Sequence, residues 1–351
     1  MRKCNTHLVI MAGGIGSRFW PMSTSEMPKQ FVDILGIGKT MIELTVDRFS
    51  SLCPVENIWV VTGESYVPIV RRLLPGISAD HILAEPVGRG TAPCVAYACW
   101  KIRLIDPEAN IAFTPSDAFI ADVPAFCRVM EEAFAFTAER RAIVTVGIRP
   151  TRPETGYGYI HVADAVAAGS NVARVAEFKE KPQLETAEAY LADGSYLWNA
   201  GIFVWNVNTV IEELRLHAPA LAENMDRMAL DFFTEKEQET VRRLFPLCEK
   251  ISIDYAVMEK ASCIFTVPAD CGWTDLGTWG SLRQQLSLDE TGNAVVGEHT
   301  RLIDSKGCIV HTSDFKEVII QGLDDCIVAA QNGRLLICRL DHEQKITDYI
   351  K

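Results

Sequence analysis

A short glycine-rich stretch near the start of the chain is followed by two cations that could together hold a polyphosphate. Gly13, Gly14 and Gly16 carry no Cβ, so the backbone N–H groups around them can approach an anion closely. Arg18 adds a planar fork of donors, and Lys29 adds a compact point charge. We therefore expect this stretch to bind phosphate groups. The plainer alternative is a tight turn after a strand, with both cations in solvent.

The familiar nucleotide-binding motifs do not fit this stretch. A dinucleotide fingerprint has a third glycine where Phe19 stands, which argues against a Rossmann dehydrogenase. A P-loop has Gly-Lys-Ser/Thr where this chain has Gly16-Ser17-Arg18. A phosphate-binding loop here is therefore of another kind.

Two aspartates stand where a metal-binding carboxylate would be useful. Asp117 follows the apolar run Ile111–Phe113, which reads as a strand, and carboxylates at a strand's carboxyl end can hold Mg²⁺. An aspartate after a strand is also a common helix cap. Asp275 has Gly272 and Gly277 near it, which lets the backbone present its carboxylate inward.

Strands and helices that could position these residues alternate along most of the chain. Short apolar runs typical of buried strands lie at 8–11, 58–61, 81–84, 111–113, 143–146, 172–178, 196–205 and 264–267. Helical spacing lies at 40–53, 66–74, 91–105, 126–134 and most of 207–247, whose charged faces we expect in solvent. The alternation predicts an α/β fold with a mostly parallel sheet and ligands at the carboxyl ends of its strands.

Polar segments at strand ends add candidate ligand contacts. The loop 85–93 follows one strand, where Thr91 could equally cap a helix. The segment 149–160 is rich in proline, glycine and tyrosine, which suits close approach to a sugar ring. Lys181 could grip a sugar phosphate or be a solvent-exposed charge. Asn199 interrupts the apolar run 196–205, which favours a site over simple core.

From about residue 293 the pattern changes to short apolar runs separated by turn residues, which predicts an all-β appendage. Asn332-Gly333 between two such runs indicates a type I′ hairpin. We place the boundary between residues 1–288 and 289–351. The segment Ser252–Lys260 precedes the apolar run 264–267. It is predicted to be an amphipathic helix capped by Ser252.

The bulk numbers exclude several classes of protein. The chain has 351 residues and a formal net charge of −12, which argues against a general nucleic-acid surface. No apolar run approaches the length of a membrane span. The eleven cysteines are scattered and form no Cys-x-x-Cys pair, so we expect neither a disulfide framework nor a thiolate zinc site, and a reducing cytoplasm fits best.

Several spaced segments resemble one family. The stretch 13–31 resembles the signature of sugar-nucleotide pyrophosphorylases, and its Trp20-Pro21 and Pro28-Lys29-Gln30-Phe31 resemble the mannose-1-phosphate guanylyltransferases in particular. Further similar segments lie at 85–93, 111–118, 149–160, 180–182, 252–260 and 271–279. Gly90 stands where the family has Asn, Ser116 and Ala118 stand in place of Ala and His, and Ala200 replaces a frequent Ser.

The resemblance implies a fold and an activity. It implies a Rossmann-like mixed sheet in a nucleotidyltransferase domain, a small β-helix-like C-terminal domain, and a homodimer. It implies that GTP and α-D-mannose 1-phosphate are converted to GDP-mannose and pyrophosphate with Mg²⁺. Because the chain ends at Lys351, we expect it to lack the isomerase domain of longer relatives. A non-catalytic nucleotide-sugar sensor, or a pyrophosphorylase for another sugar 1-phosphate, is the alternative.

The resemblance also assigns residues. Arg18 and Lys29 would hold the triphosphate, while Asp117 and Asp275 would hold the metal. The nucleotide contacts would be Ala12, Gly13, Gly14, Gly16, Ser17, Glu85, Gly88 and Thr91. The sugar contacts would be Glu154, Gly156, Gly158, Glu180, Lys181 and Asn199, with Lys181 on the sugar phosphate.

Overall fold

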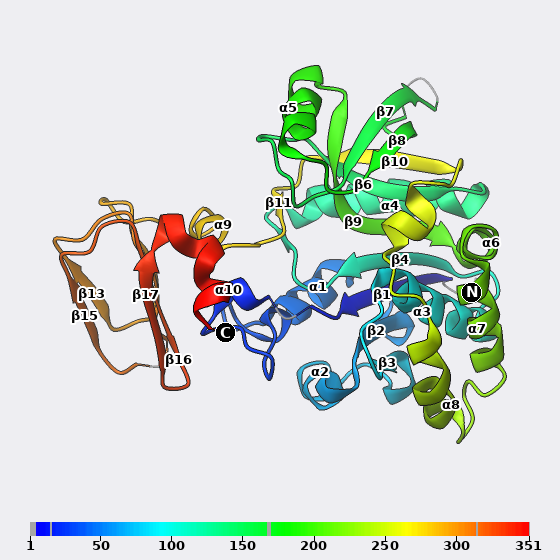
Figure 1. Ribbon diagram of the computed structural model, residues 1–351, viewed down its shortest axis with the longest axis horizontal. Coiled ribbons are helices and arrows are strands. Elements are labelled where there is room, and N and C mark those ends of the chain that lie inside the picture. The colour runs from blue at the N-terminus through cyan, green and yellow to red at the C-terminus, as the bar shows by residue number, and fades with distance from the viewer. Residues whose placement is uncertain (1–4, 15, 167–169, 314, 351) are drawn as a thin grey trace. The chain divides into compact units, whose positions relative to one another are not determined.

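The computed structural model describes residues 5–14, 16–166, 170–313 and 315–350 (Figure 1). These residues form two compact units. The first comprises the described residues up to Gly13, Val46–Pro115 and Ile120–Trp273. The second comprises Gly14–Thr45, Ser116–Phe119 and the described residues from Thr274 onward. Two short strands, β5 (Phe119–Ile120) and β11 (Trp273–Thr274), fall where the chain passes from one unit to the other.

The first unit is built on a nine-stranded sheet in the order β3-β2-β1-β4-β9-β6-β10-β8-β7. Its strands are β1 (Thr6–Ala12), β2 (Ile58–Gly63), β3 (Ile82–Glu85), β4 (Asn110–Pro115), β6 (Ile143–Ile148), β7 (Tyr159–Ala165), β8 (Ala173–Lys179), β9 (Tyr196–Asn206) and β10 (Ile264–Ala269). Strands β1 to β4 pair in parallel, as do β6 and β10, and β9 lies antiparallel between β4 and β6. The predicted α/β fold with a mixed sheet is confirmed.

The carboxyl ends of the first four strands lie at one edge of this sheet. Met11 of β1 pairs with Val61 of β2 and with Pro115 of β4, and Gly63 pairs with Glu85 at the end of β3. Because the four strands are parallel and in register, Ala12 and Glu85 both stand where ligands bind in such sheets.

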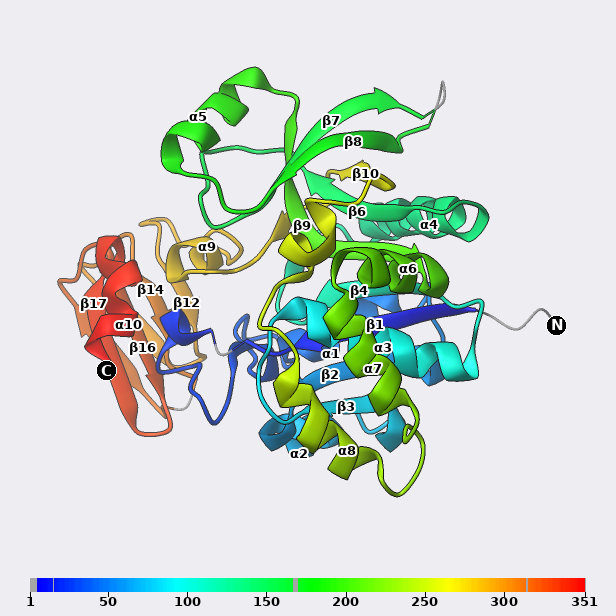
Figure 2. The same cartoon turned by 45° about the vertical axis from the view of Figure 1, so that its right-hand side comes forward.

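Helices cover the sheet because strands such as β2, β4 and β6 are buried along almost their whole length on both faces. On one face α3 (Thr91–Ile105), α6 (Val207–His217) and α7 (Pro219–Ala229) lie side by side (Figure 2). Val9 of β1 and Phe113 of β4 belong to the core that the sheet forms with these helices. Helix α3 is buried from Ala92 to Ile102. Strands β4, β6, β9 and β10 also pack against α4 (Val123–Glu139). Further helices are α1 (Met41–Phe49), α2 (Val67–Leu73), α5 (Leu184–Asp193) and α8 (Glu237–Leu244).

One expectation for 207–247 is wrong in part. The region is helical, but not all of its charged residues face solvent. Glu213 and Glu237 are buried, and Glu237 forms an ion pair with the equally buried Lys101 of α3. The attraction between the two charges offsets part of the cost of removing each of them from water.

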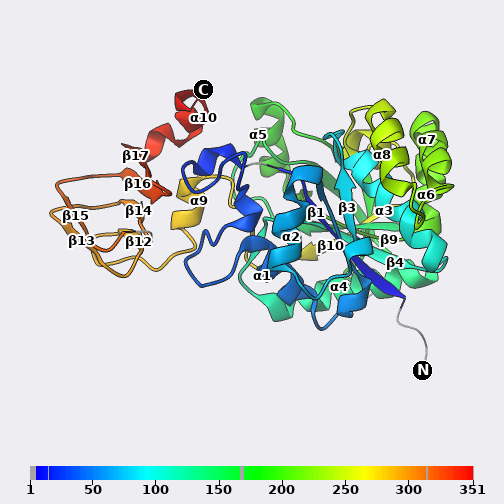
Figure 3. The same ribbon diagram turned by 90° about the horizontal axis from the view of Figure 1, so that it is seen from below.

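The second unit contains two small sheets whose strands repeat in register (Figure 3). Strands β12 (Ala294–Val296), β14 (Ile309–His311) and β16 (Cys326–Gln331) pair in parallel, and so do β13 (Thr300–Ile303) and β15 (Val318–Gln321). Cys308, Val310, Ile320 and Val328 form a core from both sheets. This repeat of parallel rungs is β-helix-like, as predicted.

The predicted hairpin is also present. β16 and β17 (Arg334–Arg339) pair antiparallel, and Gln331 pairs with Arg334 across a two-residue loop. Asn332 and Gly333 have φ of 50° and 72°. Positive φ at both loop residues is what a type I′ turn requires.

A larger core in the second unit joins parts of the chain that are far apart in sequence. The rings of Phe19 and Trp279 lie 5.2 Å apart, and Trp279 begins the short helix α9 (Trp279–Arg283). Ile309 and Ile327 of the β-helix-like sheet belong to the same cluster, as does Ile346 of α10 (Ile346–Tyr349). The boundary at 288/289 stays a prediction, but residues on both sides of it share this core.

No described helix is long and apolar enough to cross a membrane.

Candidate active site

One pocket of about 550 Å³, formed by the second unit alone, gathers the four residues predicted to be catalytic. Arg18, Lys29, Asp117 and Asp275 line it. The other lining residues are Gly16, Ser17, Phe19, Leu276, Gly277 and Thr347. The two cations that follow the glycine-rich stretch therefore lie close to carboxylates from two later turns. Binding a polyphosphate together with a metal requires such an arrangement.

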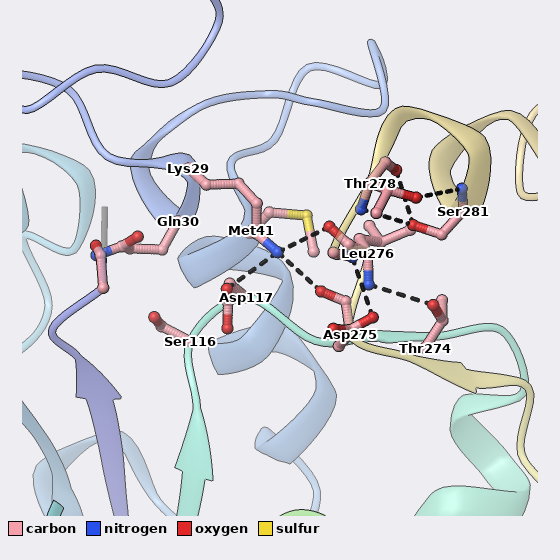
Figure 4. A network of polar contacts seen from close by, with 12 residues as sticks. Lys29, Gln30, Met41, Ser116, Asp117, Thr274, Asp275, Leu276, Thr278 and Ser281 are labelled. Carbon is pink, nitrogen blue, oxygen red and sulfur yellow. Dashed lines mark hydrogen bonds and ion pairs between the residues drawn. The ribbon is translucent and has the colours of Figure 1, made fainter. Parts of the chain in front are cut away.

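Lys29 is the centre of the polar contacts in this pocket (Figure 4). Its Nζ lies 2.9 Å from Asp117 Oδ2 and donates to the backbone oxygens of Asp275 (2.8 Å) and Leu276 (3.1 Å). An ammonium has three N–H donors, so these three oxygens use all of them. Lys29 is only 3% exposed, and it holds the two aspartate-bearing segments together.

The turn that carries Asp275 depends on a glycine. The backbone N–H of Leu276 donates to Thr274 Oγ1, and that of Gly277 donates to Asp275 Oδ1 at 3.0 Å. A Cβ on Gly277 would lie 2.7 Å from Asp275 Oδ2. Since that distance is too short, only glycine allows the carboxylate to stay beside the backbone at this point.

The glycine-rich stretch is shaped by its contacts with Lys29 and Gln30. Gly16 has φ of +70°, and a Cβ there would lie 2.7 Å from the Cβ of Lys29. Gln30 Nε2 donates to the backbone oxygen of Gly14 at 2.9 Å. A Cβ on Gly14 itself would meet nothing within 4 Å, so open space lies against this part of the backbone. Arg18 is exposed, which leaves its guanidinium accessible to an anion.

The donor set of this pocket fits a Mg²⁺ ion. Among the described residues no group of three or more His, Cys, Asp and Glu side chains forms a closed metal cage. Mg²⁺ is commonly held by only one or two carboxylates together with phosphate oxygens and water. Asp117 and Asp275 supply two carboxylates in one pocket, and Lys29 shows that a cation is favourable beside Asp117.

In the first unit, Glu85 is a buried carboxylate at the end of β3. It is 9% exposed, and its Oε1 has no hydrogen-bond partner among the described residues. Burial raises its pKa to about 8. A buried carboxylate without a partner is costly unless a ligand supplies donors, so Glu85 is a strong candidate for a ligand contact.

The loop after Glu85 explains why glycine stands at position 90. Gly90 has φ of +84°, and a Cβ there would lie 2.5 Å from the backbone oxygen of Ile251. The backbone N–H of Ala92 donates to that same oxygen, and the N–H of Ile253 donates to Thr91 Oγ1 at 2.9 Å. Thr91 therefore fixes a neighbouring segment, while Gly88 has open space around its Cα.

A second cluster in the first unit contains most of the predicted sugar contacts. The backbone N–H of Asn199 donates to Gly158 at 2.8 Å, and a Cβ on Gly158 would lie 2.7 Å from Glu180 Oε2. Glu180 is buried and pairs with the Nζ of Lys181. Burial lowers the pKa of Lys181, but the hydrogen bond and charge of Glu180 outweigh this and raise it, so the lysine stays charged.

Two predicted sugar contacts lie in the turn before β7. Glu154 accepts from the N–H of Gly156 at 3.0 Å and pairs with Arg152 at 3.0 Å. The Arg152 guanidinium lies over the Trp198 ring, at 5.3 Å from its centroid. Glu154 and Gly156 thus belong to a turn that is braced by an aromatic ring.

The sequence interpretation did not single out Asp254, which contacts the predicted sugar residue Asn199. The segment predicted as an amphipathic α-helix forms a π-helix at Asp254–Met258. Asn199 Nδ2 donates to Asp254 Oδ1 at 3.3 Å. The available signal was an acidic residue beside apolar ones in a segment that matches the family, but spacing alone did not indicate which way its carboxylate points.

The predicted residues therefore fall into groups by unit. The phosphate pocket belongs to the second unit, whereas Glu85, Gly88, Thr91 and the sugar contacts belong to the first. Ala12, at the end of β1, accepts a hydrogen bond from Thr62 Oγ1 through its backbone oxygen, and Gly13 follows it. The residue assignments themselves stay predictions.

Comparison with known proteins agrees with this geometry. The nucleotidyl transferase family model matches residues 7–292, and the fold and the phosphate pocket define the same class, a nucleotidyltransferase. Members of this class generally use a divalent metal.

Relatives narrow the class. A mannose-1-phosphate guanylyltransferase of Salmonella montevideo is 37% identical over 98% of this chain and 73% of the relative. One from Escherichia coli K12 is 34% identical over 95% of this chain and 72% of the relative. A crystal structure described as mannose-1-phosphate geranyltransferase from Thermus thermophilus is 30% identical, with a TM-score of 0.87 over 99% of this chain and 98% of that one. The chain belongs to the mannose-1-phosphate guanylyltransferase family.

Proposed function

We propose that this protein converts GTP and α-D-mannose 1-phosphate to GDP-mannose and pyrophosphate. The observation that carries the proposal is that Arg18, Lys29, Asp117 and Asp275 line the same pocket in a chain of this family. These residues combine fixed positive charge with carboxylates that suit a metal, as phosphoryl and nucleotidyl transfer require.

In this reaction an oxygen of the sugar phosphate attacks the α-phosphorus of GTP. The new P–O bond forms as the bond between the α-phosphorus and the bridging oxygen breaks, and pyrophosphate leaves with that oxygen. Arg18 and the backbone N–H groups of the glycine-rich stretch neutralise triphosphate charge, and Lys181 holds the attacking phosphate. The sequence predicted that Lys29 holds the triphosphate as well, but its three N–H donors are used by protein oxygens, so we assign it to keeping the pocket in shape through Asp117 and the backbone of Asp275.

Asp117 and Asp275 would hold Mg²⁺ in this pocket. When bound, the ion neutralises charge on the phosphates and so stabilises the negative charge that moves to the leaving pyrophosphate.

Glu85 gives a physical reason for choosing guanine. Guanine presents two adjacent donors, N1–H and the N2 amino group, and a carboxylate can accept from both. Adenine and the pyrimidine bases of UTP, CTP and dTTP do not present that pair. Because Glu85 is buried with Oε1 lacking a partner among the described residues, a base that leaves it without donors binds at a disadvantage.

We also propose that the protein forms a homodimer through its C-terminal strands. Leu335 and Ile337 of β17 are 55% and 56% exposed. They lie two residues apart on this strand, so their side chains share one face and form a small exposed apolar patch. Covering such a surface with a second copy would remove it from water. Light scattering of Ile337→Asp should show a monomer, and an unchanged oligomer would overturn this proposal.

We place the protein in the cytoplasm. The described cysteines are all free thiols, most of them buried, which suits a reducing compartment.

The test of the activity is pyrophosphate release from GTP in the presence of mannose 1-phosphate and Mg²⁺, with GDP-mannose identified by mass spectrometry. Both products in equal amounts are expected. Binding of both substrates without pyrophosphate release would instead indicate a nucleotide-sugar sensor.

A further inference from the structure

The cluster around Asn199 contains one carboxylate, Asp254, that the proposed reaction does not use. The amide of Asn199 is oriented without ambiguity. Its Oδ1 accepts from Thr145 Oγ1 at 2.8 Å and from the N–H of Gly201 at 3.0 Å. A backbone N–H can only donate, so the oxygen must face Gly201 and the NH₂ group must face Asp254. Asn199 therefore presents Asp254 with a donor and holds its carboxylate in place.

The backbone also fixes the position of Asp254. The residue begins the π-helix Asp254–Met258, and π-turns are rare and frequently occur at functional sites. Just before it, the N–H of Ile253 donates to Thr91 Oγ1, and Ile251 exchanges hydrogen bonds with Arg89 and Ala92. The segment that presents Asp254 is thus tied to the loop that follows Glu85.

Asp254 is partly exposed, and hydrogen bonds hold its carboxylate, because Asn199 Nδ2 and the side chain of Ser252 donate to it. The two carboxylate oxygens can accept further hydrogen bonds, so the group can still accept one from a ligand. The charges of Glu180 and Lys181 act on Asp254, and Glu259 follows on the next turn and accepts from the N–H of Glu180. Lys181 pairs with Glu180, and among the described residues Asp254 forms no ion pair. Burial raises the pKa of Asp254 to about 7, and the negative charge of Glu180 adds to the effect.

A carboxylate in that position costs stability, so a structural role alone does not explain it. Asn199 would keep its orientation through Thr145 and Gly201 without Asp254. A neutral residue could also close the π-turn. What a neutral side chain could not do is accept a charge-assisted hydrogen bond from a donor of the ligand.

We infer that Asp254 accepts a hydrogen bond from one hydroxyl group of the sugar 1-phosphate and thereby determines which sugar is used. The inference rests on the proposed function, because it places a sugar phosphate beside Glu180, Lys181 and Asn199. Hydroxyl groups are the donors that a sugar offers. A site that holds a partly buried acceptor for one of them discriminates against a sugar that lacks it or carries it on the other face of the ring.

The test is a double cycle between the protein and the sugar. Wild type and Asp254→Asn are assayed with GTP and mannose 1-phosphate, and with its 2-, 3-, 4- and 6-deoxy analogues. Asp254→Asn should raise the KM for mannose 1-phosphate by about tenfold or more while changing the KM for GTP less than about threefold, as loss of a charge-assisted hydrogen bond implies. With wild type, the KM for one deoxy analogue should be raised by a similar factor over that for mannose 1-phosphate. With Asp254→Asn, the KM for that analogue should be no higher than the KM for mannose 1-phosphate.

The inference would be overturned if the effects of the substitution and of the missing hydroxyl on KM multiplied for all four analogues. It would also be overturned if Asp254→Asn raised the KM values for GTP and for mannose 1-phosphate equally. Glu188→Gln, the same change of carboxylate to amide at an exposed position of α5, is the control and should behave as wild type. Circular dichroism checks that Asp254→Asn is folded. Absence of turnover in wild type would contradict the proposed function instead. In that case calorimetric binding of the same five sugar phosphates completes the cycle and still decides the role of Asp254.

Discussion

The phosphate pocket of the second unit and the carboxylates of the first unit handle charge in opposite ways. In the pocket, Lys29 and Asp117 already form an ion pair inside the protein, and the ammonium is fully used by protein oxygens. In the first unit, Glu85 and Asp254 are carboxylates that form no ion pair among the described residues, and burial raises the pKa of both. The charged groups of the pocket are therefore suited to binding a charged ligand. The two carboxylates of the first unit are suited to accepting hydrogen bonds from uncharged groups of a ligand.

This contrast has a consequence for stability. A carboxyl group whose pKa is higher in the folded than in the unfolded protein binds its proton more tightly when folded. Folding stability therefore falls as pH rises from the unfolded pKa to the folded one. For Glu85 that window runs from about 4.5 to about 8, and for Asp254 from about 3.8 to about 7. Both groups act against stability near neutral pH, as is common for residues kept for function.

The largest expected effect is on the pocket. Asp117→Asn and Asp275→Asn should each lower kcat by at least about a hundredfold, because an amide lacks the charge that Mg²⁺ prefers. The measurement is kcat at saturating substrates, with circular dichroism to show that each variant is folded. Asp324→Asn, an exposed carboxylate of the same unit, is the matched control. Turnover near that of wild type in either variant would remove that residue from the metal site.

The next largest effect concerns the acceptor for the base. Glu85→Gln should lower kcat/KM for GTP by about tenfold to a hundredfold, because an amide cannot accept from both guanine donors. The KM of wild type for GTP should also fall as pH rises from 6 to 8, since the pKa of Glu85 is about 8 and guanine binds its charged form. The variant should show no such pH dependence. An equal dependence in both proteins would show that another group titrates.

A smaller effect should separate the two phosphate groups. Lys181→Ala should raise the KM for mannose 1-phosphate about tenfold and leave that for GTP almost unchanged, because loss of a charged partner weakens only the phosphate that it binds. Initial rates with one substrate varied at a time measure both constants. If the KM for GTP rises instead, Lys181 belongs to the triphosphate.

The smallest effect is on stability. Asp254→Asn removes a carboxyl group whose pKa is raised to about 7, so the variant should gain stability over wild type as pH rises from 5 to 8. The gain is bounded by roughly 1.4 kcal/mol for each unit of pKa shift, or a few kcal/mol in all. Urea unfolding at both pH values measures it. If the free energies of unfolding of the two proteins differed by the same amount at pH 5 and pH 8, the raised pKa of Asp254 would be contradicted.

The sequence predicted what depends on short-range pattern. The strands of the main sheet, the Asn332-Gly333 hairpin and the convergence of Lys29, Asp117 and Asp275 all follow from apolar runs, turn residues and the family signature. Each needs only local geometry or a match to known spacing.

What the sequence did not predict depends on contacts between distant segments. Gly90 looked like a departure from the family, and only the backbone oxygen of Ile251 explains it. The π-turn that aims Asp254 at Asn199 has no periodicity of its own. The core shared by Phe19 and Trp279 with the C-terminal strands joins segments that the change of hydrophobic pattern near residue 293 had separated.

The most direct test of the account is a matrix of pyrophosphate-release rates for GTP, ATP, UTP and dTTP against the 1-phosphates of mannose, glucose, galactose and N-acetylglucosamine. If Glu85 selects guanine and the cluster with Lys181 selects the sugar, GTP with mannose 1-phosphate gives the highest kcat/KM, and changing either substrate lowers it. A clear preference for UTP or dTTP, or for another sugar 1-phosphate with GTP, would contradict the account.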